Sequence, residues 1–308
     1  MKEEVDVQLV HEEGGRLYRF DYGRVRIFVC DVDAALKMIC SLATYGRQSA
    51  AIFQRTVSEM LDLCQRAKDG PILGYEHLPT IWGPILYGGA HIIPADMEEK
   101  LRRSAPMIGN FAIKVDRDRD EEGRWRAHIS HSKSFNLTAY RREVFRLLCD
   151  ECAAGGVTVL EALAFAPNYH QSEHATILCP TVSDVAIRNW ADYCDQCQIS
   201  IQVICTGVYK VQEQGFKLPL TDFGVDGGMF VPARQITAYH EYYCLKDKSA
   251  PICFIGDAGN RLTPNQPERS REHLLDTREV FLARSQAPGA FLREIDEQLL
   301  DLSQVLNA

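Results

Sequence analysis

Apolar residues follow two different periods along the chain. Residues 5–10 and 16–30 alternate apolar and polar positions, and Glu13-Gly14-Gly15 between them is a turn signal. From about residue 33, and again over residues 49–67, apolar residues instead recur every three or four positions. The pattern therefore predicts two strands followed by two helices.

The stretch from about residue 126 to residue 206 organises the rest of the prediction. Its pattern predicts, in order, strand 126–135, helix 138–154, strand 157–166, strand 175–180, helix 181–197 and strand 199–207. Strand-length apolar runs between helical segments are typical of a largely parallel sheet with helices on its faces. We therefore expect an α/β fold, a three-layer domain with a largely parallel sheet.

The flanking segments are less regular. We expect irregular packing over residues 71–95, then a short charged helix and a hairpin of strands 107–115 and 124–135. A long glycine-containing connection is expected over residues 206–237, which favours a binding loop. The remaining pattern predicts strands 238–245 and 251–255 and two closing helices.

This division predicts an N-terminal α+β region over residues 1–105, a central α/β domain over 106–265 and C-terminal helices over 266–308 that pack on it as a hairpin. In the last helix an apolar seam of about two heptads comprises Leu292, Ile295, Leu299, Leu302 and Leu306. The seam is compatible with docking on the chain's own domain or with a homodimer through this helix.

Composition and charge narrow the class of protein. The chain has 46% hydrophobic and 25% charged residues, as an ordinary globular protein has, and its net charge of −8 argues against a nucleic-acid partner. No apolar run approaches the roughly 18–20 residues that a membrane span needs, and the acidic start lacks the apolar stretch of a signal peptide. Eleven cysteines, most in apolar segments, favour a reducing compartment, so we expect a cytoplasmic protein.

Two Cys-x-x-Cys pairs form the strongest metal pattern in the sequence. They are Cys149 with Cys152, and Cys194 with Cys197, each at the end of a predicted helix. Four thiolates suit tetrahedral zinc, so zinc is the candidate cofactor. The alternative is that the cysteines are small core residues, because each pair continues the apolar stripe of its helix.

Two other segments carry candidate chemistry. His131-Ser-Lys133 resembles the phospholipase D-like phosphodiesterases, in which His is the nucleophile and Lys holds the phosphate, although the family's Asp after the Lys is absent. His170-Gln-Ser-Glu173-His174 matches the H-x-x-E-H pattern of zinc peptidases, but the following strand leaves no room for the required helix. We interpret it as a loop that contributes polar groups.

The predicted topology also places a site. Ligands of open α/β sheets bind beyond the carboxyl ends of the strands, where the strand order switches. Three polar loops follow predicted strands there, over residues 166–173, 206–237 and 256–265. The predicted ligand-binding residues are Asn168, Tyr169, His170, Glu173, Thr206, Asp222, Asp226, Asp257 and Asn260.

The first functional hypothesis is a cytosolic ligand-sensing or regulatory protein that holds a small molecule at this edge. The alternative is a hydrolase or phosphodiester-acting enzyme that uses His131 and Lys133, or a metal held by His170, His174 and an Asp. A structural partner protein is the third. The sequence leaves the identity of the ligand open, as well as whether the protein is an enzyme.

Overall fold

The computed structural model describes residues 5–41, 44, 46–76, 78, 80–85, 88–105, 108–122, 125–135, 145–164, 174–212, 222–224, 228–242, 267–283 and 289–307.

One large sheet contains strands from most of the chain. In the described residues it has nine strands in the order β1-β2-β3-β11-β9-β7-β4-β5-β6. Neighbours from β3 to β5 are parallel, whereas β1, β2 and β6 are antiparallel to their partners. The strands are β1 (Gln8–His11), β2 (Arg16–Tyr22), β3 (Val25–Asp31), β4 (Thr80–Pro84), β5 (Ile108–Arg119), β6 (Trp125–Phe135), β7 (Phe145–Cys149), β9 (His174–Leu178) and β11 (Ser200–Cys205).

A second, smaller sheet continues three of these strands. Its order is β13-β12-β10-β8, with β8, β10 and β12 parallel. Its strands are β8 (Cys152–Ala153), β10 (Thr181–Ser183), β12 (Gly207–Gln212) and β13 (Asp222–Gly224). Because β8, β10 and β12 directly follow β7, β9 and β11, the small sheet lies at the carboxyl edge of the large one.

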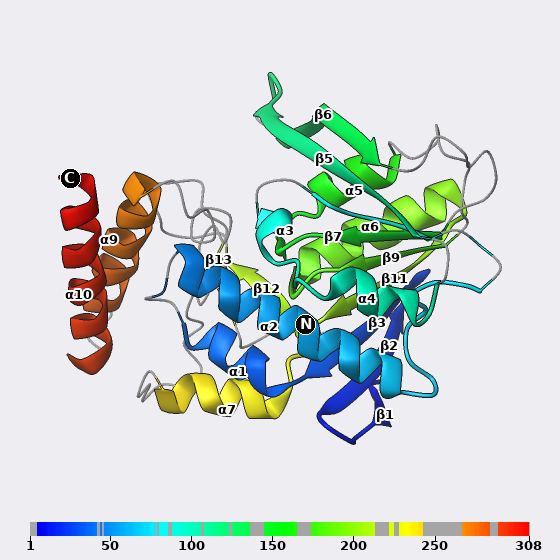
Figure 1. Ribbon diagram of the computed structural model, residues 1–308, viewed down its shortest axis with the longest axis horizontal. Coiled ribbons are helices and arrows are strands. Elements are labelled where there is room, and N and C mark those ends of the chain that lie inside the picture. Colours follow the sequence, from blue (N-terminus) through cyan, green and yellow to red (C-terminus); the bar gives the residue numbers. More distant parts are fainter. Residues whose placement is uncertain are drawn as a thin grey trace.

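Helices cover both faces of the large sheet (Figure 1). On one face α5 (Val157–Ala164) contacts β5 and β6, and α6 (Asp184–Cys197) contacts β2 and β3. On the other face α2 (Gly46–Arg66) contacts β2, β3 and α4, while α1 contacts α2 and α7. The remaining helices are α1 (Asp33–Ile39), α3 (Gly88–His91), α4 (Met97–Arg102), α7 (Ala233–Tyr242), α9 (Pro267–Ala283) and α10 (Gly289–Leu306).

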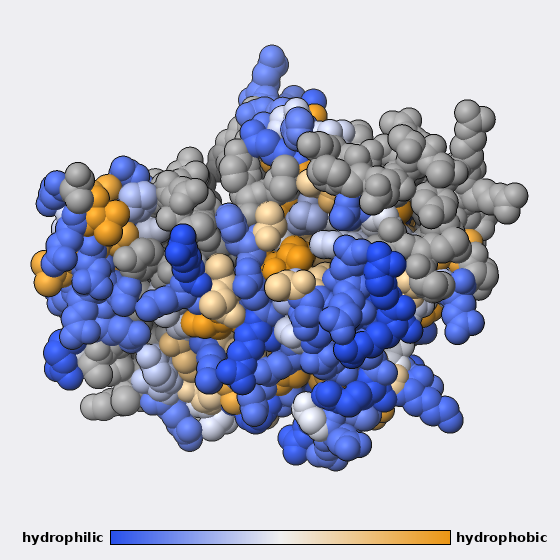
Figure 2. All heavy atoms as spheres, in the orientation of Figure 1, coloured by the Kyte–Doolittle hydropathy of each residue, from blue (hydrophilic) through white to orange (hydrophobic). Residues whose placement is uncertain are grey.

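Each face of the sheet has its own apolar core. Phe28, Leu147 and Ile204 pack toward α2, whereas Val29, Leu148 and Val203 pack toward α5 and α6. Since β7 is buried along its whole length and neighbouring residues enter opposite cores, the continuous apolar runs are those of a sheet covered on both sides. The outer surface over α2 and α4 is largely hydrophilic (Figure 2). The predicted three-layer α/β architecture is confirmed.

Two central elements are the reverse of the prediction. Part of predicted helix 138–154 is strand β7, and most of predicted strand 157–166 is helix α5. The run FRLLC offers apolar residues at helical spacing, but it is five residues buried on all sides, which suits a central parallel strand. In VTVLEALA the β-branched residues suggest a strand, yet the buried Val159, Ala162 and Leu163 follow helical spacing.

Three further predictions were wrong. Strand β4 lies inside the region expected to be irregular. This buried five-residue strand contains Gly83 and Pro84, which are uncommon in strands, so the sequence pattern did not indicate it. Most of predicted strand 238–245 belongs to helix α7, whose buried Gln235 and Tyr239 are one helical turn apart. The predicted connection 206–237 likewise contains β12, β13 and the start of α7. Predicted strand 251–255 lies outside the described residues.

The C-terminal helices are present as predicted, and they contact each other. Within the predicted seam Ile295 and Leu302 are buried, together with Leu274 of α9. The seam therefore packs within the chain, while Leu300 and Val305 on α10 remain exposed. In the described part of the chain, no helix combines the length and apolar character of a membrane span.

The predicted boundary at residue 105 falls between β4 and β5, which are paired neighbours in the large sheet. Strands β1 to β4 of the predicted N-terminal region thus complete the sheet of the predicted central domain.

Candidate functional site

The strand order reverses at β4 and β7. From β4 the chain first adds β5 and β6 on one side, and it then places β7 on the other side, followed by β9 and β11 toward β3. Strands β4 and β7 are parallel, so their carboxyl ends lie at the same edge. Ligands of open α/β sheets bind at such a reversal. The loop that follows β7 is therefore the candidate ligand site.

This β7–α5 loop, residues 150–156, begins with two acidic residues. Asp150 is buried, its N–H donates to the Leu178 carbonyl at 3.1 Å, and its carboxylate accepts the Glu151 N–H at 3.0 Å. Helix α3 approaches closely, because a Cβ added at Gly89 would lie 2.5 Å from the Cys149 carbonyl oxygen. The start of the loop is fixed by the sheet and by α3.

The end of the loop is held by side chains of helix α6 and of its N-cap. The Ser183 hydroxyl contacts the Ala154 carbonyl, Asn189 Nδ2 donates to the Gly155 carbonyl at 2.8 Å, and Trp190 Nε1 donates to the Gly156 carbonyl at 3.0 Å. Ser183 also caps α6 by accepting the Ala186 N–H at 2.8 Å. Three consecutive carbonyls of the loop thus face α6.

The orientation of these carbonyls determines where the N–H groups point. The peptide bonds are trans, so each N–H points opposite to the preceding carbonyl. The N–H groups of Gly155, Gly156 and Val157 therefore face away from α6. Val157 begins α5, and the first N–H groups of a helix have no partner within the helix.

The two loop glycines have different surroundings. Gly156 has a φ of +73°, and an added Cβ would lie 2.4 Å from Trp190 Nε1, so a side chain is excluded there. A Cβ added at Gly155 would meet no described atom within 4 Å. The loop is therefore tightly packed against α6 and open beside Gly155.

These groups have complementary chemistry. Backbone N–H groups at the start of a helix favour an anionic oxygen such as that of a phosphate. The carboxylates of Asp150 and Glu151, a few residues earlier, accept hydrogen bonds from hydroxyl or amino groups. One ligand that carries both kinds of group would match the loop.

Thr206 is the predicted ligand residue whose side chain the structure describes. It is buried, and its hydroxyl donates to the Pro180 carbonyl at 2.8 Å and lies 2.8 Å from the Tyr209 hydroxyl. Gln235 Nε2 donates to the Thr206 carbonyl at 2.8 Å, and Gln235 Oε1 accepts from Tyr209 at 3.0 Å. Thr206 thus joins β11, β12 and α7 in an internal network.

An ion pair between the exposed Arg234 and the buried Asp31 lies at the carboxyl end of β3. Arg234 of α7 contacts Asp31 at 3.2 Å and Asp33 at 2.6 Å, and it also donates to the Asp31 carbonyl at 3.0 Å. Burial raises the pKa of Asp31, and the Arg234 charge opposes that rise. The pair fastens α7 to the sheet across about two hundred residues of sequence.

For the other predicted ligand residues, the structure describes no side chain, so it does not test whether they lie together. Asp222 lies on strand β13, and the structure describes its backbone only. Asn168, Tyr169, His170, Glu173, Asp226, Asp257 and Asn260 lie outside the described residues. Their grouping remains a prediction.

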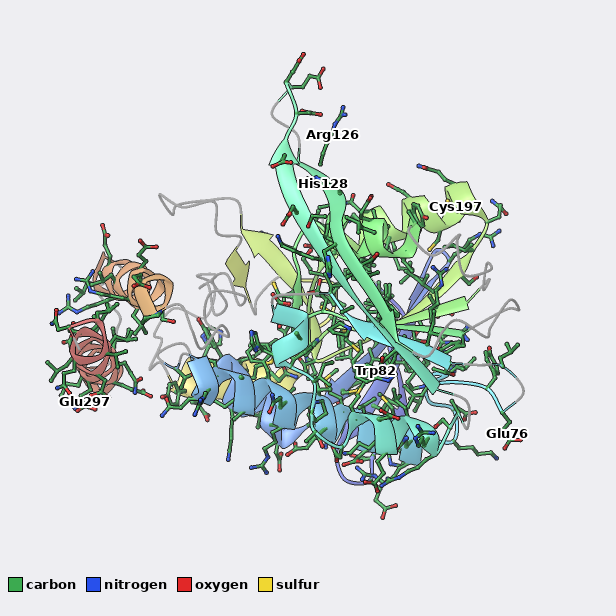
Figure 3. The ribbon with its side chains drawn as sticks, turned by 45° about the horizontal axis from the view of Figure 1, so that its top comes forward. Glu76, Trp82, Arg126, His128, Cys197 and Glu297 are labelled. Atoms are coloured by element: carbon green, nitrogen blue, oxygen red, sulfur yellow. The ribbon has the colours of Figure 1, made fainter. Side chains whose placement is uncertain are left out.

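The candidate catalytic residues His131 and Lys133 lie on β6, the edge strand of the large sheet, where they pair in register with Lys114 and Ala112. His131 is exposed. The tip of this hairpin, with Arg126 and His128, projects from the molecule (Figure 3). Strand β6 is separated from β7 by β5 and β4, so neither residue lies on the strands that form the reversal.

The predicted zinc grouping of four cysteines is not formed. Among the described residues, which include all four, no three His, Cys, Asp or Glu side chains are placed to hold a metal. Cys149 and Cys152 lie at the carboxyl edge of the sheet, whereas Cys194 and the exposed Cys197 end α6, just before the amino end of β11 (Figure 3). The pairs lie at opposite edges because Cys149 is on a strand and not on a helix. Burial also raises the pKa of Cys149, and that of Cys194 to about 12, which disfavours thiolates.

The β7–α5 loop was missed because Gly155-Gly156 reads as the stop signal of a helix that ends at residue 154. The available signal was a buried apolar run followed by Asp-Glu, a glycine pair and an apolar helical stripe. That order is strand, turn and helix start.

Comparisons with known proteins are weak. No protein-family model and no curated protein sequence matches the chain. Among solved structures, adenine phosphoribosyltransferase from Leishmania donovani has 9% identity and a TM-score of 0.38 over 60% of this chain and 84% of that chain. The Trypanosoma brucei enzyme has 8% identity and a TM-score of 0.36 over 58% and 82%. The Giardia lamblia enzyme has 12% identity and a TM-score of 0.29 over 65% and 93%. At these values we base the function on the geometry of the site.

Proposed function

We propose that this chain binds a small phosphate-bearing molecule, of the size of a phosphorylated sugar or a nucleotide, at the β7–α5 loop. The observation that carries the proposal is the loop's geometry at the reversal of strand order. Three of its carbonyls face α6, its N–H groups face the other way, and the space beside Gly155 is open.

The carboxylates of Asp150 and Glu151 favour hydroxyl groups on the part of the ligand that does not carry the phosphate. A bare phosphate would meet the N–H groups but also the nearby carboxylates of Asp150 and Glu151. A phosphorylated sugar supplies the phosphate for the N–H groups and hydroxyl groups for the carboxylates. We therefore expect ribose 5-phosphate and AMP to bind more tightly than inorganic phosphate or ribose.

The test is isothermal titration calorimetry of the full chain with ribose 5-phosphate, AMP, inorganic phosphate and ribose. The test variant is Gly155→Glu, which places a carboxylate in the open space beside the loop. The matched control is Gly289→Glu at the start of α10, which adds the same charge at another helix start. Gly155→Glu should weaken binding of the phosphorylated probes at least about tenfold, since a charge-assisted hydrogen bond contributes roughly 1.5–3 kcal/mol.

Gly289→Glu should bind like the native chain. Equal binding of ribose and ribose 5-phosphate, or unchanged binding in Gly155→Glu, would contradict the proposal. Following the bound probe by phosphorus NMR over hours separates the two predicted roles. An unchanged probe supports a sensor or regulatory protein, and a new phosphorus signal supports a phosphodiester- or phosphate-acting enzyme.

A further inference from the structure

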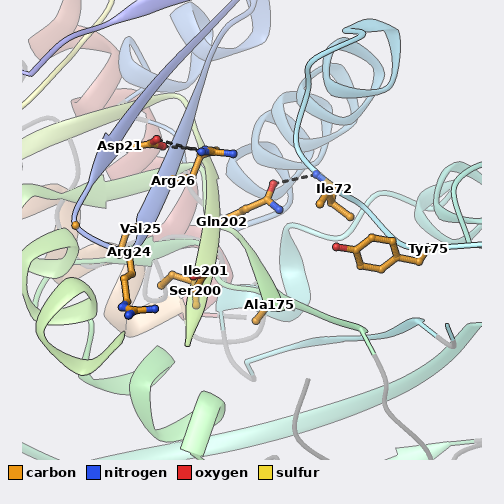
Figure 4. A pocket seen from close by; sticks show the side chains of 11 residues that line it. Asp21, Arg24, Val25, Arg26, Ile72, Tyr75, Ala175, Ser200, Ile201 and Gln202 are labelled. Atoms are coloured by element: carbon orange, nitrogen blue, oxygen red, sulfur yellow. Dashed lines mark hydrogen bonds and ion pairs between the residues drawn. The ribbon is translucent and has the colours of Figure 1, made fainter. Parts of the chain in front are cut away.

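A cavity lies at the amino edge of the large sheet, opposite the edge that carries the β7–α5 loop. It has a volume of about 420 Å³, within the range of roughly 300–1,000 Å³ typical of small-molecule pockets. Its walls come from the β2–β3 turn, from the starts of β9 and β11 and from the segment after α2 (Figure 4). Its accessible apolar side chain is Ile72, because Val25 and Ile201 are at most 2% exposed and pack in the core on the other face of the sheet.

A polar row leads into this cavity. Asp21, Arg26, Gln202 and Thr176 are paired in register across β2, β3, β11 and β9. The row holds the segment after α2, because Gln202 Oε1 accepts the Ile72 N–H at 2.9 Å and Thr176 donates to the Ile72 carbonyl at 2.9 Å. The cavity is thus bounded on two sides by hydrogen-bonded structure.

The acceptors of this row are engaged within the chain. Both carboxylate oxygens of Asp21 accept from Arg26, at 2.8 and 3.1 Å, and Gln202 Oε1 accepts from Ile72. The groups that point into the cavity are the guanidinium end of Arg26, the amide nitrogen of Gln202 and the Tyr75 hydroxyl (Figure 4). The cavity therefore presents mainly hydrogen-bond donors.

Two arginines line the cavity, and each has a carboxylate partner. Arg26 pairs with Asp21 at 2.8 Å. On its outer side Arg24 pairs with Asp195 at 3.3 Å and donates to Gln198 at 2.8 Å, which fixes its position. Arg26 is half exposed, with 52% of its side chain accessible, so a ligand can reach it from solvent.

We infer that this amino-edge cavity is a binding site for a small organic anion with an apolar body, such as an aromatic carboxylate or phosphate. The anionic group would accept from Arg26, Gln202 and Tyr75, and the apolar body would lie on Ile72. This site is separate from the β7–α5 loop, because the amino and carboxyl edges of the sheet lie at opposite ends of the strands.

The experiment uses benzoate and phenyl phosphate as anionic probes and benzamide as their neutral counterpart, each titrated into the full chain by calorimetry. The test variant is Gln202→Glu, which keeps the acceptor for Ile72 but replaces the donor with a negative charge. The matched control is Gln8→Glu on β1, where the acceptor to Arg19 at 2.9 Å is likewise kept and one charge is added.

Both anions should bind saturably and at least about tenfold more tightly than benzamide, because guanidinium donors favour a charged acceptor. Gln202→Glu should weaken both anions at least about tenfold, whereas Gln8→Glu should not. Tyr75→Phe, which keeps the ring against Phe145, should also weaken them. Thermal unfolding of each variant shows that it is folded.

The two sites are distinguished with Gly155→Glu. Anion binding that survives Gly155→Glu and is lost in Gln202→Glu supports the amino-edge site, whatever happens to the phosphorylated sugars. Three results would overturn the proposed amino-edge site: no saturable binding of the anions, equal affinity for benzamide, or loss of anion binding only in Gly155→Glu.

Discussion

At the scale of single residues, the loop glycines show how adjacent identical residues can have different functions. Gly156 is required by its φ of +73° and by the indole of Trp190. A Cβ added at Gly155 would have no described atom within 4 Å, and the Gly155 backbone is not in the left-handed region. Residue type alone could not separate them, because the difference comes from a helix more than thirty residues later in the chain.

Alanine substitution should separate their contributions to stability. Gly156→Ala should lower the free energy of unfolding by about 2–4 kcal/mol, from a left-handed backbone and a forced contact with Trp190. Gly155→Ala, the matched control, should change it by less than about 1 kcal/mol. Urea denaturation of the three proteins checks this, and equal losses for the two variants would show that the loop is not held against α6 as described.

At the scale of elements, the apolar pattern predicted β3, α2, the β5–β6 hairpin, β9, α6 and β11. It failed at the short, buried strands β4 and β7, and at the partly exposed helices α5 and α7, which were predicted largely as strands. For β7 and α5 the local pattern fitted both helix and strand. Burial against two cores decided for a strand at β7, whereas the buried Val159, Ala162 and Leu163 of α5 all face one core. The edge of the sheet that carries the candidate loop was predicted from topology. The residues of the β7–α5 loop were not predicted, because the sequence of strand, turn and helix start was interpreted as the end of a helix.

The attachment of α7 to β3 should depend on pH through Asp31. Its folded-state pKa is raised by burial, so the folded state binds the proton more tightly than the unfolded state. The stability contributed by this group is therefore fully present below the unfolded pKa, about 3.9, and is lost as pH rises through the folded pKa. The native chain should lose stability relative to Asp31→Asn as pH increases upward from about 4.

Arg234 opposes the rise, so Arg234→Met should raise the pKa of Asp31 further and extend this loss to higher pH. At neutral pH it should lower the free energy of unfolding by roughly 1–2 kcal/mol, since it removes the cation beside a buried carboxylate but the exposed Arg234 side chain is partly screened by solvent. Urea denaturation at pH steps from 4 to 7 measures all three proteins. Parallel pH profiles for the native chain and Asp31→Asn would rule out this assignment.

At the scale of the whole molecule, one sheet carries two candidate sites at its opposite edges. The small sheet of β8, β10 and β12 continues β7, β9 and β11 at the carboxyl edge, and it places α6 against the β7–α5 loop. At the amino edge the segment after α2 closes over the polar row. Both arrangements join residues from distant parts of the sequence, which is why local patterns indicated neither in detail.

The strand order of this sheet predicts whether residues 106–308 can fold without residues 1–105. Residues 106–308 alone lack β3, which pairs with β11, and β4, which lies between β7 and β5. They also lack α2, whose buried Phe53 and Met60 cover one face. We therefore expect residues 106–308 to show no cooperative urea transition, because three interior strand edges, those of β11, β7 and β5, and an apolar face would be exposed. Co-expression with residues 1–105 should restore the transition and yield a co-purifying pair, since the two pieces complete one sheet. A sharp transition for residues 106–308 alone would instead establish a domain boundary near residue 105, with the nine-stranded sheet formed by docking of two independently stable parts.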